Sequence, residues 1–135
     1  MRNIIHTVIL FVLVFACVNA IADPLSPIKS TGTFEFTGTE IGQAHPFAKV
    51  QVTVTGRNLT GKPVEVERIV PRDPQGISVE FVPARIAADG TVSIKLDIVL
   101  SATVGRVAHY FDVFVKDAVD PIDGFVVRGF SDWLI

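Results

Sequence analysis

Three aspartates near the C-terminal end are the side chains whose type and spacing best suit ion binding. Asp117, Asp120 and Asp123 recur at every third position in the stretch KDAVDPIDG, residues 116–124. A Ca²⁺ ion takes about six to eight oxygen ligands, and clustered loop aspartates can supply several of them. The alternative is a solvated loop in which Asp-Pro and Asp-Gly form turns. The stretch has no EF-hand pattern, so we predict no metal site and keep these three residues as the candidates for one.

Two histidines follow the N-terminal segment and carry the other metal-binding or proton-transfer chemistry. His45 precedes Pro46 in an expected loop, whereas His109 shares the alternation of Phe111 and Val113 and is expected to face the core or an interface. A zinc or copper site needs about three or four ligands. Because these histidines are far apart in sequence, we predict no cofactor. A small-ligand or calcium module that uses His109 or the aspartate loop is the alternative function.

Catalytic motifs are missing from the sequence. It contains no G-x-S-x-G, no H-E-x-x-H, no phosphate-binding loop and no G-x-G-x-x-G. A hydrolase built on strands would need a nucleophile, a base and an orienting group in one cleft, and the residue pattern assembles no such set. We therefore predict that the protein is not an enzyme and has no catalytic residues.

The C-terminal stretch FVVRGFSDWLI, residues 125–135, is the best candidate for a protein-binding surface. Val126, Arg128 and Phe130 fall on one face of an expected strand, and Trp133 follows it. Arginine and aromatic residues are enriched at protein interfaces, and exposed aromatic patches mark partner sites. The alternative is that Trp133 and Leu134 fold back onto the base of the domain. We predict that a partner protein is contacted by Val126, Arg128, Phe130 and Trp133.

The stretch RNLTGKP, residues 57–63, predicts a tight structural turn between two strands. An Asn58 side chain can accept a hydrogen bond from the backbone two residues on. Gly61 can adopt a positive φ, and Pro63 cannot donate a backbone hydrogen bond to the next strand. These three residues are therefore assigned a structural and not a binding role.

Short alternating segments separated by Gly and Pro indicate an all-β chain. Val92, Ile94, Leu96, Ile98 and Leu100 form the longest clean alternation, and no segment has helical spacing. After Arg68 the apolar alternation shifts by one residue, which predicts a β-bulge or a strand end. We expect about seven strands in an immunoglobulin-like antiparallel β-sandwich of the Greek-key type. The expected strands are residues 33–37, 47–56, 64–70, 77–82, 91–100, 106–115 and 124–130.

The N-terminal segment has the features of a secretory signal peptide. Arg2 precedes an apolar run over residues 4–16, and Ala20-Ile21-Ala22 offers the small residues that a signal peptidase reads. We predict a signal peptide over residues 1–22 and one domain over 23–135, with cleavage after Ala20 as the alternative. The protein is then periplasmic or secreted. Cys17 offers a lipoprotein alternative, and only its lipidation would place the protein on a membrane.

The charge of the chain limits the class of partner, and its cysteine content limits how the domain can be stabilised. The formal net charge is −2, without a long run of either sign, which argues against a nucleic-acid surface. Cys17 is the only cysteine in the sequence, so a domain starting at Asp23 has no disulfide and is held together by its core.

The order of turn and strand signals resembles that of bacterial periplasmic Ig-like domains of unknown function, which are related to the ASPM–SPD–Hydin and major-sperm-protein-like domains. The segment Asn58–Val64 matches the family's Asn-to-Pro turn. Residues 81–98, FVPARIAADGTVSIKLDI, match its Pro, Gly turn and long alternating strand. GFVVRGF, residues 124–130, matches its last strand with a late Gly129. The resemblance spans residues 34–130.

The resemblance implies a domain that braces, tethers or binds other proteins, and it implies no reaction. Many bacterial members carry Cys-Gly-Cys after the third strand, where this chain has PRDPQG, residues 71–76, and no cysteine. Any metal or redox role of such cysteines is therefore not expected here. Pilus chaperones use two Ig-like domains, whereas this chain has room for one. The sequence thus predicts a non-catalytic envelope module that binds a protein partner, either by strand addition at a sheet edge or through its last strand.

Overall fold

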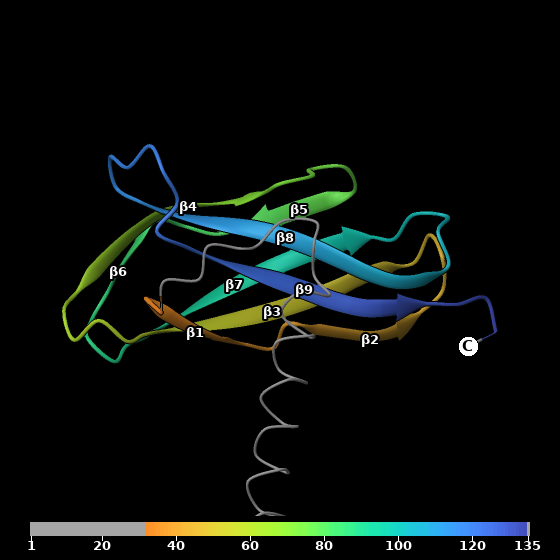
Figure 1. The fold of residues 1–135 in the computed structure, drawn as a ribbon, viewed down its shortest axis with the longest axis horizontal. Helices are drawn as coiled ribbons and strands as arrows, with labels where there is room; N and C mark the ends of the chain where they lie inside the picture. The colour runs from red at the N-terminus through yellow and green to blue at the C-terminus, as the bar shows by residue number, and fades with distance from the viewer. Residues whose placement is uncertain (1–31, 135) are drawn as a thin grey trace, which may run out of the picture.

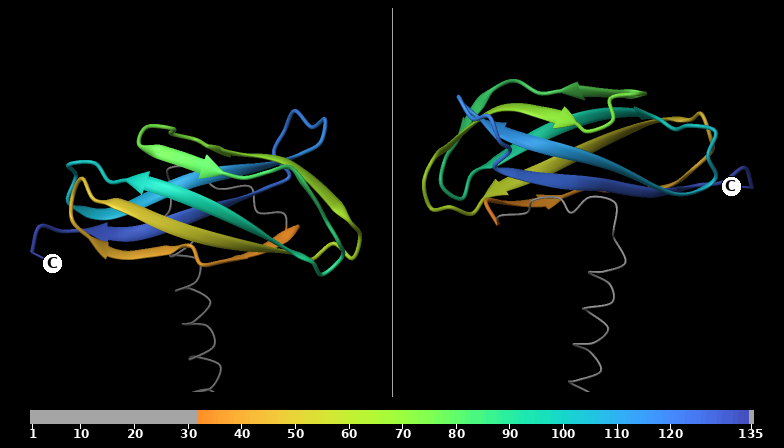
Figure 2. Two further views of the ribbon diagram at one scale, coloured as in Figure 1. Left: turned by 180° about the vertical axis from the view of Figure 1, so that it is seen from behind. Right: turned by 45° about the horizontal axis from the view of Figure 1, so that its top comes forward.

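Two β-sheets packed face to face form the part of the chain that the computed structural model describes, residues 32–134 (Figure 1). The four-stranded sheet has the order β1 (Phe34–Thr37), β3 (Lys49–Asn58), β7 (Thr91–Val99), β5 (Ile77–Glu80). The five-stranded sheet has the order β2 (Glu40–Ala44), β9 (Asp123–Ser131), β8 (Gly105–Val115), β4 (Val64–Pro71), β6 (Ala84–Ile86). Figure 2 shows the four-stranded sheet from its own side in the left view. The predicted all-β sandwich is confirmed.

The predicted features of the N-terminal segment lie outside the described residues. These are the signal peptide over residues 1–22, its two cleavage positions and Cys17. Within residues 32–134, no helix is long and apolar enough to cross a membrane.

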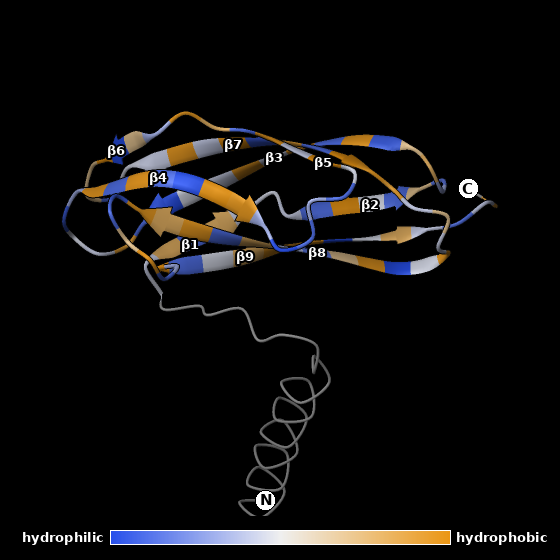
Figure 3. Cartoon of the chain, turned by 90° about the horizontal axis from the view of Figure 1, so that it is seen from above, coloured by the Kyte–Doolittle hydropathy of each residue, from blue (hydrophilic) through white to orange (hydrophobic). Residues whose placement is uncertain are grey.

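The core lies between the sheets and is built from alternating residues, as the sequence predicts. In β7, Ile94, Leu96 and Ile98 are fully buried, while Lys95 between them is exposed and Asp97 is half-buried. Figure 3 shows this alternation of hydrophobic and hydrophilic residues along the strands. β3 pairs with β7 from Lys49 to Arg57, which aligns the two strongest alternations of the chain on one inner face.

A row of phenylalanine rings joins the two sheets at one end of the core. Phe36 of β1 lies 4.9 Å from Phe125 of β9 between ring centroids, and Phe125 stacks on Phe111 of β8 at 4.9 Å. Phe34 extends the row at 5.7 Å from Phe36. Such pairs add to the stability that ring burial provides, by about 0.5–1.5 kcal/mol each.

The structure has two strands that the sequence did not predict, β2 and β6. After β1 the chain crosses to the other sheet at Gly38, whose φ is 76°. A Cβ atom at this position would lie 2.5 Å from the Thr53 carbonyl oxygen, so only glycine fits. β2 then pairs with β9 in parallel, which differs from the fully antiparallel arrangement that we expected. β6 arises in the same way, because the chain leaves β5 and crosses back to pair with β4.

Two details of the strands follow the sequence prediction closely. The pairing of β4 with β8 shifts register between Val66 and Arg68, where the bulge or strand end was predicted. The Asp89-Gly90 pair forms the turn before β7, and Asp89 has a φ of 59°. Both features set which side chains of β4 and β7 point outward.

Candidate functional site

Asn58 is a fully buried hydrogen-bonding centre at the end of β3. Its Oδ1 accepts hydrogen bonds from the Thr60 backbone N–H (2.9 Å) and the Thr60 hydroxyl (2.8 Å), as the turn prediction requires. Its Nδ2 donates to the carbonyl oxygens of Lys62 (2.6 Å), Ile86 (3.2 Å) and Ala87 (3.2 Å). Gly61 has a φ of 75°, and Pro63 is the last residue before β4. The structural role predicted for this turn therefore extends to β6, which Asn58 ties to β3.

The three aspartates of the loop between β8 and β9 have different environments. Asp123 is buried at the start of β9, where its Oδ2 accepts a hydrogen bond from the Phe34 N–H (2.9 Å) and its Oδ1 one from the Gly124 N–H (2.8 Å). Asp117 and Asp120 are exposed. Asp117 has a φ of 63° and its N–H donates to Glu67 Oε2 (3.2 Å). The expectation that all three lie in a solvated loop is thus wrong for Asp123, which holds β1 to β9.

The described part of the chain has no cluster of side chains that could form a metal centre. Nowhere within residues 32–134 do three or more His, Cys, Asp or Glu side chains gather closely enough to hold an ion.

The residues predicted to bind a partner point outward from the five-stranded sheet. Phe125 and Val127 of β9 are buried in the core, whereas the alternate residues Val126, Arg128 and Phe130 lie on the outer side. Phe130 is 38% exposed. The prediction that these three share a face is confirmed by their alternation, while their contact with a partner stays a prediction.

Neighbouring strands extend this outer side into a larger surface. On β8, Ala108 lies opposite Arg128 and Tyr110 lies opposite Val126. Phe114 of β8 lies opposite Arg68 of β4. We call this surface the arginine–aromatic face, and it comprises Arg68, Arg72, Ala108, Tyr110, Phe114, Val126, Arg128 and Phe130, with Arg106 at its end opposite Phe130.

Two arginines of the arginine–aromatic face are held in place by aromatic rings. The guanidinium carbon of Arg68 lies 4.1 Å from the centroid of the Phe114 ring. The Arg72 guanidinium lies 5.7 Å from the Tyr110 ring centroid and makes two contacts of 3.3 Å with the Asp112 carboxylate. A guanidinium laid over a ring keeps its N–H edges available for a partner's oxygen atoms.

The outer side of the four-stranded sheet is different in kind. Along β3 its outward residues alternate Lys, Gln and Thr up to Arg57, which pairs with Glu35 of β1 at 3.5 Å. Along β7 they are Thr91, Ser93, Lys95 and Asp97, followed by Val99 at the strand end. None of these outward residues is aromatic. The two faces of the sandwich therefore present different chemistry.

Trp133 lies at the end of the sandwich and does not fold into the core. It is 57% exposed and its ring lies 6.1 Å from that of Phe47, which is itself 61% exposed. Leu134 is exposed as well. The alternative in which Trp133 and Leu134 pack onto the base of the domain is therefore wrong for the described residues. The Trp133–Phe47 pair adds an exposed aromatic element beside the β2–β3 loop.

His109 has the inward orientation that its position in β8 predicts. It lies opposite Val127 in the pairing of β8 with β9, on the same side as buried Phe111. Its Nε2 atom is buried and has no hydrogen-bond partner among the described residues. Burial of the ring lowers the pKa of His109, and the nearby Asp73 carboxylate opposes this effect. His45, by contrast, is exposed in the β2–β3 loop.

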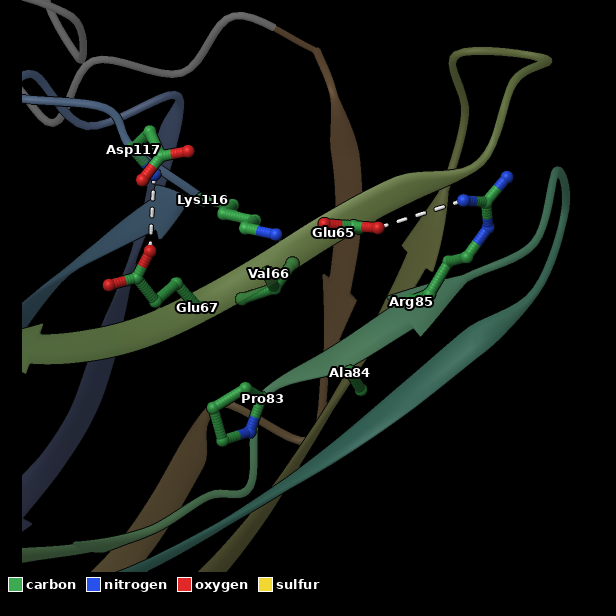
Figure 4. A pocket seen from close by; sticks show the side chains of 8 residues that line it. All are labelled: Glu65, Val66, Glu67, Pro83, Ala84, Arg85, Lys116 and Asp117. Carbon is green, nitrogen blue, oxygen red and sulfur yellow. Dashed lines mark hydrogen bonds and ion pairs between the residues drawn. The ribbon is translucent and has the colours of Figure 1, made fainter.

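A charged pocket between β4, β6 and the end of β8 was not foreseen from the sequence. Its volume is about 500 Å³, and Figure 4 shows its charged side chains. Glu65 pairs with Arg85 at 3.6 Å on one side of the pocket. On the other side the Asp117 backbone N–H donates a hydrogen bond to Glu67 Oε2, and Lys116 lies between these two pairs. These residues come from two strands, β4 and β6, and from the loops before β6 and after β8, so only knowledge of the β4–β6 and β4–β8 pairing would have brought them together. Because most of its charges already face opposite charges or backbone N–H groups, the pocket points to no particular ligand.

No protein-family model and no curated protein matches the sequence. Solved structures match by fold. A Caenorhabditis elegans MSP family member, WR4, has a TM-score of 0.51 at 9% identity, over 74% of this chain and 98% of that chain. A protein of unknown function from Porphyromonas gingivalis W83 has a TM-score of 0.53 at 14% identity, over 80% of this chain and 50% of that chain. The ASH/PapD-like domain of human CEP192 reaches 0.48 at 14% identity, over 82% and 92%. At these identities the likeness concerns the fold alone: the chain is an immunoglobulin-like β-sandwich whose fold is similar to that of an MSP family member.

Proposed function

We propose that this protein is a non-catalytic module of the cell envelope that binds another protein through its arginine–aromatic face. The observation that carries the proposal is the asymmetry of the two outer sheet surfaces. One surface displays arginines beside phenylalanine and tyrosine rings, and the other displays mainly small polar and balanced charged residues. Arginine and aromatic residues dominate the energetics of protein interfaces.

The packing of the arginines supports binding by this face. Arg68 lies over Phe114, and Arg72 is fixed by both Asp112 and Tyr110. Side chains that are already ordered lose less conformational entropy when a partner arrives, which leaves more of the contact energy as affinity.

Binding through the face is favoured over strand addition at a sheet edge. Of the four edge strands within residues 32–134, β2 has five residues, β1 and β5 have four each, and β6 has three. Short edges offer few backbone groups for a partner strand. The face spans β9, β8 and β4, each of which has eight residues or more.

The envelope location rests on the apolar segment 4–16 and the small residues at 20 and 22. Cell fractionation with N-terminal sequencing of the recovered protein tests it. A new N-terminus at Ile21 or Asp23 supports secretion, and a lipid on Cys17 supports the tethered alternative. Recovery of the intact N-terminus in the cytosol would contradict both.

The binding face is tested by in-cell crosslinking with a photoreactive amino acid at one of two exposed positions. Ala108 lies within the arginine–aromatic face, and Thr53 is the matched position on the outer side of the four-stranded sheet. We expect a discrete crosslinked partner from position 108 and none from position 53. The reverse pattern, or no protein crosslink from position 108, would refute the assignment.

A further inference from the structure

A second cavity opens beside the β2–β3 and β7–β8 loops. These loops lie at the end of the sandwich that carries the C-terminus (Figure 1). Its volume is about 620 Å³, within the range of small-molecule sites. The residues that matter for its chemistry come from four separate segments. They are Phe47, Asp73, Val99, Leu100, Arg106 and His109.

The cavity contains two opposite charges that do not neutralise each other. Asp73 and Arg106 both line it, yet neither forms an ion pair within 4 Å with any described residue. The Asp73 Oδ1 accepts only a local hydrogen bond from the Gln75 N–H (3.2 Å). Two unpaired, opposite charges in one cavity are suited to a ligand that carries both signs itself.

His109 also lines this cavity. Its Nε2 is buried without a hydrogen-bond partner among the described residues, which is costly for a polar group. Burial lowers the pKa of His109, so the ring is neutral near pH 7 and adds no second positive charge beside Arg106.

The remaining wall is apolar and includes a strained residue. Phe47 has a φ of 65°, an unfavourable conformation for a bulky side chain. Strain of this kind clusters at functional sites. Together with Val99 and Leu100, the Phe47 ring provides a surface for an apolar group.

We propose that this cavity binds a free α-amino acid with an apolar or aromatic side chain. Arg106 would bind the ligand carboxylate, Asp73 its ammonium group, and Phe47 with Val99 its side chain. A simple anion would be repelled by Asp73 and a simple cation by Arg106. A neutral apolar molecule would cover both charges without pairing them, which is unfavourable. The inference does not depend on the proposed protein-binding function, since it needs no partner protein, although Arg106 at the end of the arginine–aromatic face also lines this cavity.

The test is isothermal titration of the protein, purified as the cell processes it, with L-phenylalanine and two capped analogues. N-acetyl-phenylalanine lacks the ammonium charge and phenylalaninamide lacks the carboxylate. We expect phenylalanine to bind at least about tenfold more tightly than either analogue. Leucine and tryptophan extend the panel of side chains. If none of the three amino acids binds at about 10 mM, or if the capped analogues bind equally well, the proposal is wrong.

Two variants test which charged residue binds which charged group of the ligand. In Arg106→Gln, phenylalanine should lose its advantage over phenylalaninamide but keep its advantage over the N-acetyl form. In Asp73→Asn the opposite pattern is expected. Arg57→Gln, on the far sheet, is the matched control and should bind as the unaltered protein does. If a variant fails to fold, the analogue series on the unaltered protein still decides. Unchanged selectivity in both folded variants would overturn the assignment.

Discussion

Asn58 shows how much a single residue can hold in a small sandwich. Its side chain is fully buried and joins the 60–62 turn to the carbonyl groups of Ile86 and Ala87. We predict that Asn58→Ala lowers the free energy of unfolding by about 3 kcal/mol, because several buried backbone groups lose their partners at once. Urea unfolding measures the loss. Gln51→Ala, at an exposed position of the same strand, should change stability by less than about 0.5 kcal/mol.

His109 makes the stability of the protein dependent on pH in a defined direction. Its pKa is lowered in the folded state, first by burial and against the opposing effect of Asp73. The unfolded chain, in which the pKa is about 6.5, therefore binds the proton more readily. Above about pH 6.5 His109 takes nothing from the free energy of unfolding. This free energy decreases as the pH drops from there toward the folded-state pKa. Comparing urea midpoints at about pH 7.5 and 5.5 measures this loss.

The substitution His109→Gln isolates this contribution of the histidine. The variant should lose less stability on acidification than the unaltered protein, since glutamine does not titrate. His45→Gln, in an exposed loop, should leave the pH dependence unchanged. A His109→Gln variant with the original pH dependence would show that other groups cause it.

The sequence predicted some of these residue roles and not others, for a simple reason. The bond from Thr60 N–H to Asn58 Oδ1 spans two residues and follows from local turn chemistry. The bonds from Asn58 to Ile86 and Ala87 span 28 and 29 residues. They depend on β6, which pattern alone did not reveal. The burial of Asp123 was missed likewise, because its partner Phe34 lies 89 residues away.

At the scale of the elements, Gly129 controls the docking of β2 onto β9. A Cβ atom at Gly129 would lie 2.8 Å from the Cβ of Ile41 and 2.9 Å from the Gly42 carbonyl oxygen. We predict that Gly129→Ala destabilises the protein by about 1–3 kcal/mol and loosens β2 first. Hydrogen exchange should show faster exchange for amides in β2 and little change in β3.

A double variant tests the origin of this effect. Adding Ile41→Gly to Gly129→Ala removes the Ile41 Cβ, the atom that would lie 2.8 Å from the new methyl group. The double variant should therefore lose less stability than the sum of the two single changes. Strict additivity would mean that the contact with Ile41 does not limit the packing of β2.

Long alternating strands were predictable, whereas short crossing strands were not. In β7 the pattern runs through nine residues and fixes one dry face. β2 has one large apolar residue, Ile41, which lies between Glu40 and Gly42, and β6 has three residues in all. These strands form because Gly38 and Pro83 lie where the chain leaves one sheet for the other, which is a tertiary requirement.

At the scale of the whole molecule, the two outer faces should differ in binding. We predict that Phe130→Ala and Trp133→Ala each weaken partner binding by at least about tenfold, because exposed aromatic side chains at interfaces are frequent hot spots. Both side chains are partly or largely exposed, so the free energy of unfolding should change by less than about 1 kcal/mol. Val82→Ala, exposed in the loop between β5 and β6, is the control and should leave binding unchanged.

Two results would contradict this prediction. Global unfolding of both aromatic variants would make Phe130 and Trp133 part of the core. Unaltered binding by two folded variants would remove them from the contact surface and direct attention to Arg68 and Arg72.

The arginine–aromatic face was only partly predictable. Val126, Arg128 and Phe130 belong to one strand, and their alternation places them on one side. Arg68 and Arg72 join them because β8 lies between β4 and β9 and because a bulge sets the register after Val66. Strand order is a property of the whole fold. The pattern of a single strand therefore shows which of its own residues point outward, but not which residues of neighbouring strands lie beside them.

The burial of Asn58 has a consequence for producing the protein. Asn58-Leu59-Thr60 has the form of an N-glycosylation acceptor. Both the amide nitrogen that would carry a glycan and the hydroxyl of Thr60 are engaged inside the turn. A eukaryotic secretory host attaches glycans to chains that have not yet folded, and a sugar on this nitrogen would prevent the turn from closing around Asn58. A bacterial host avoids the modification and leaves the turn free to form.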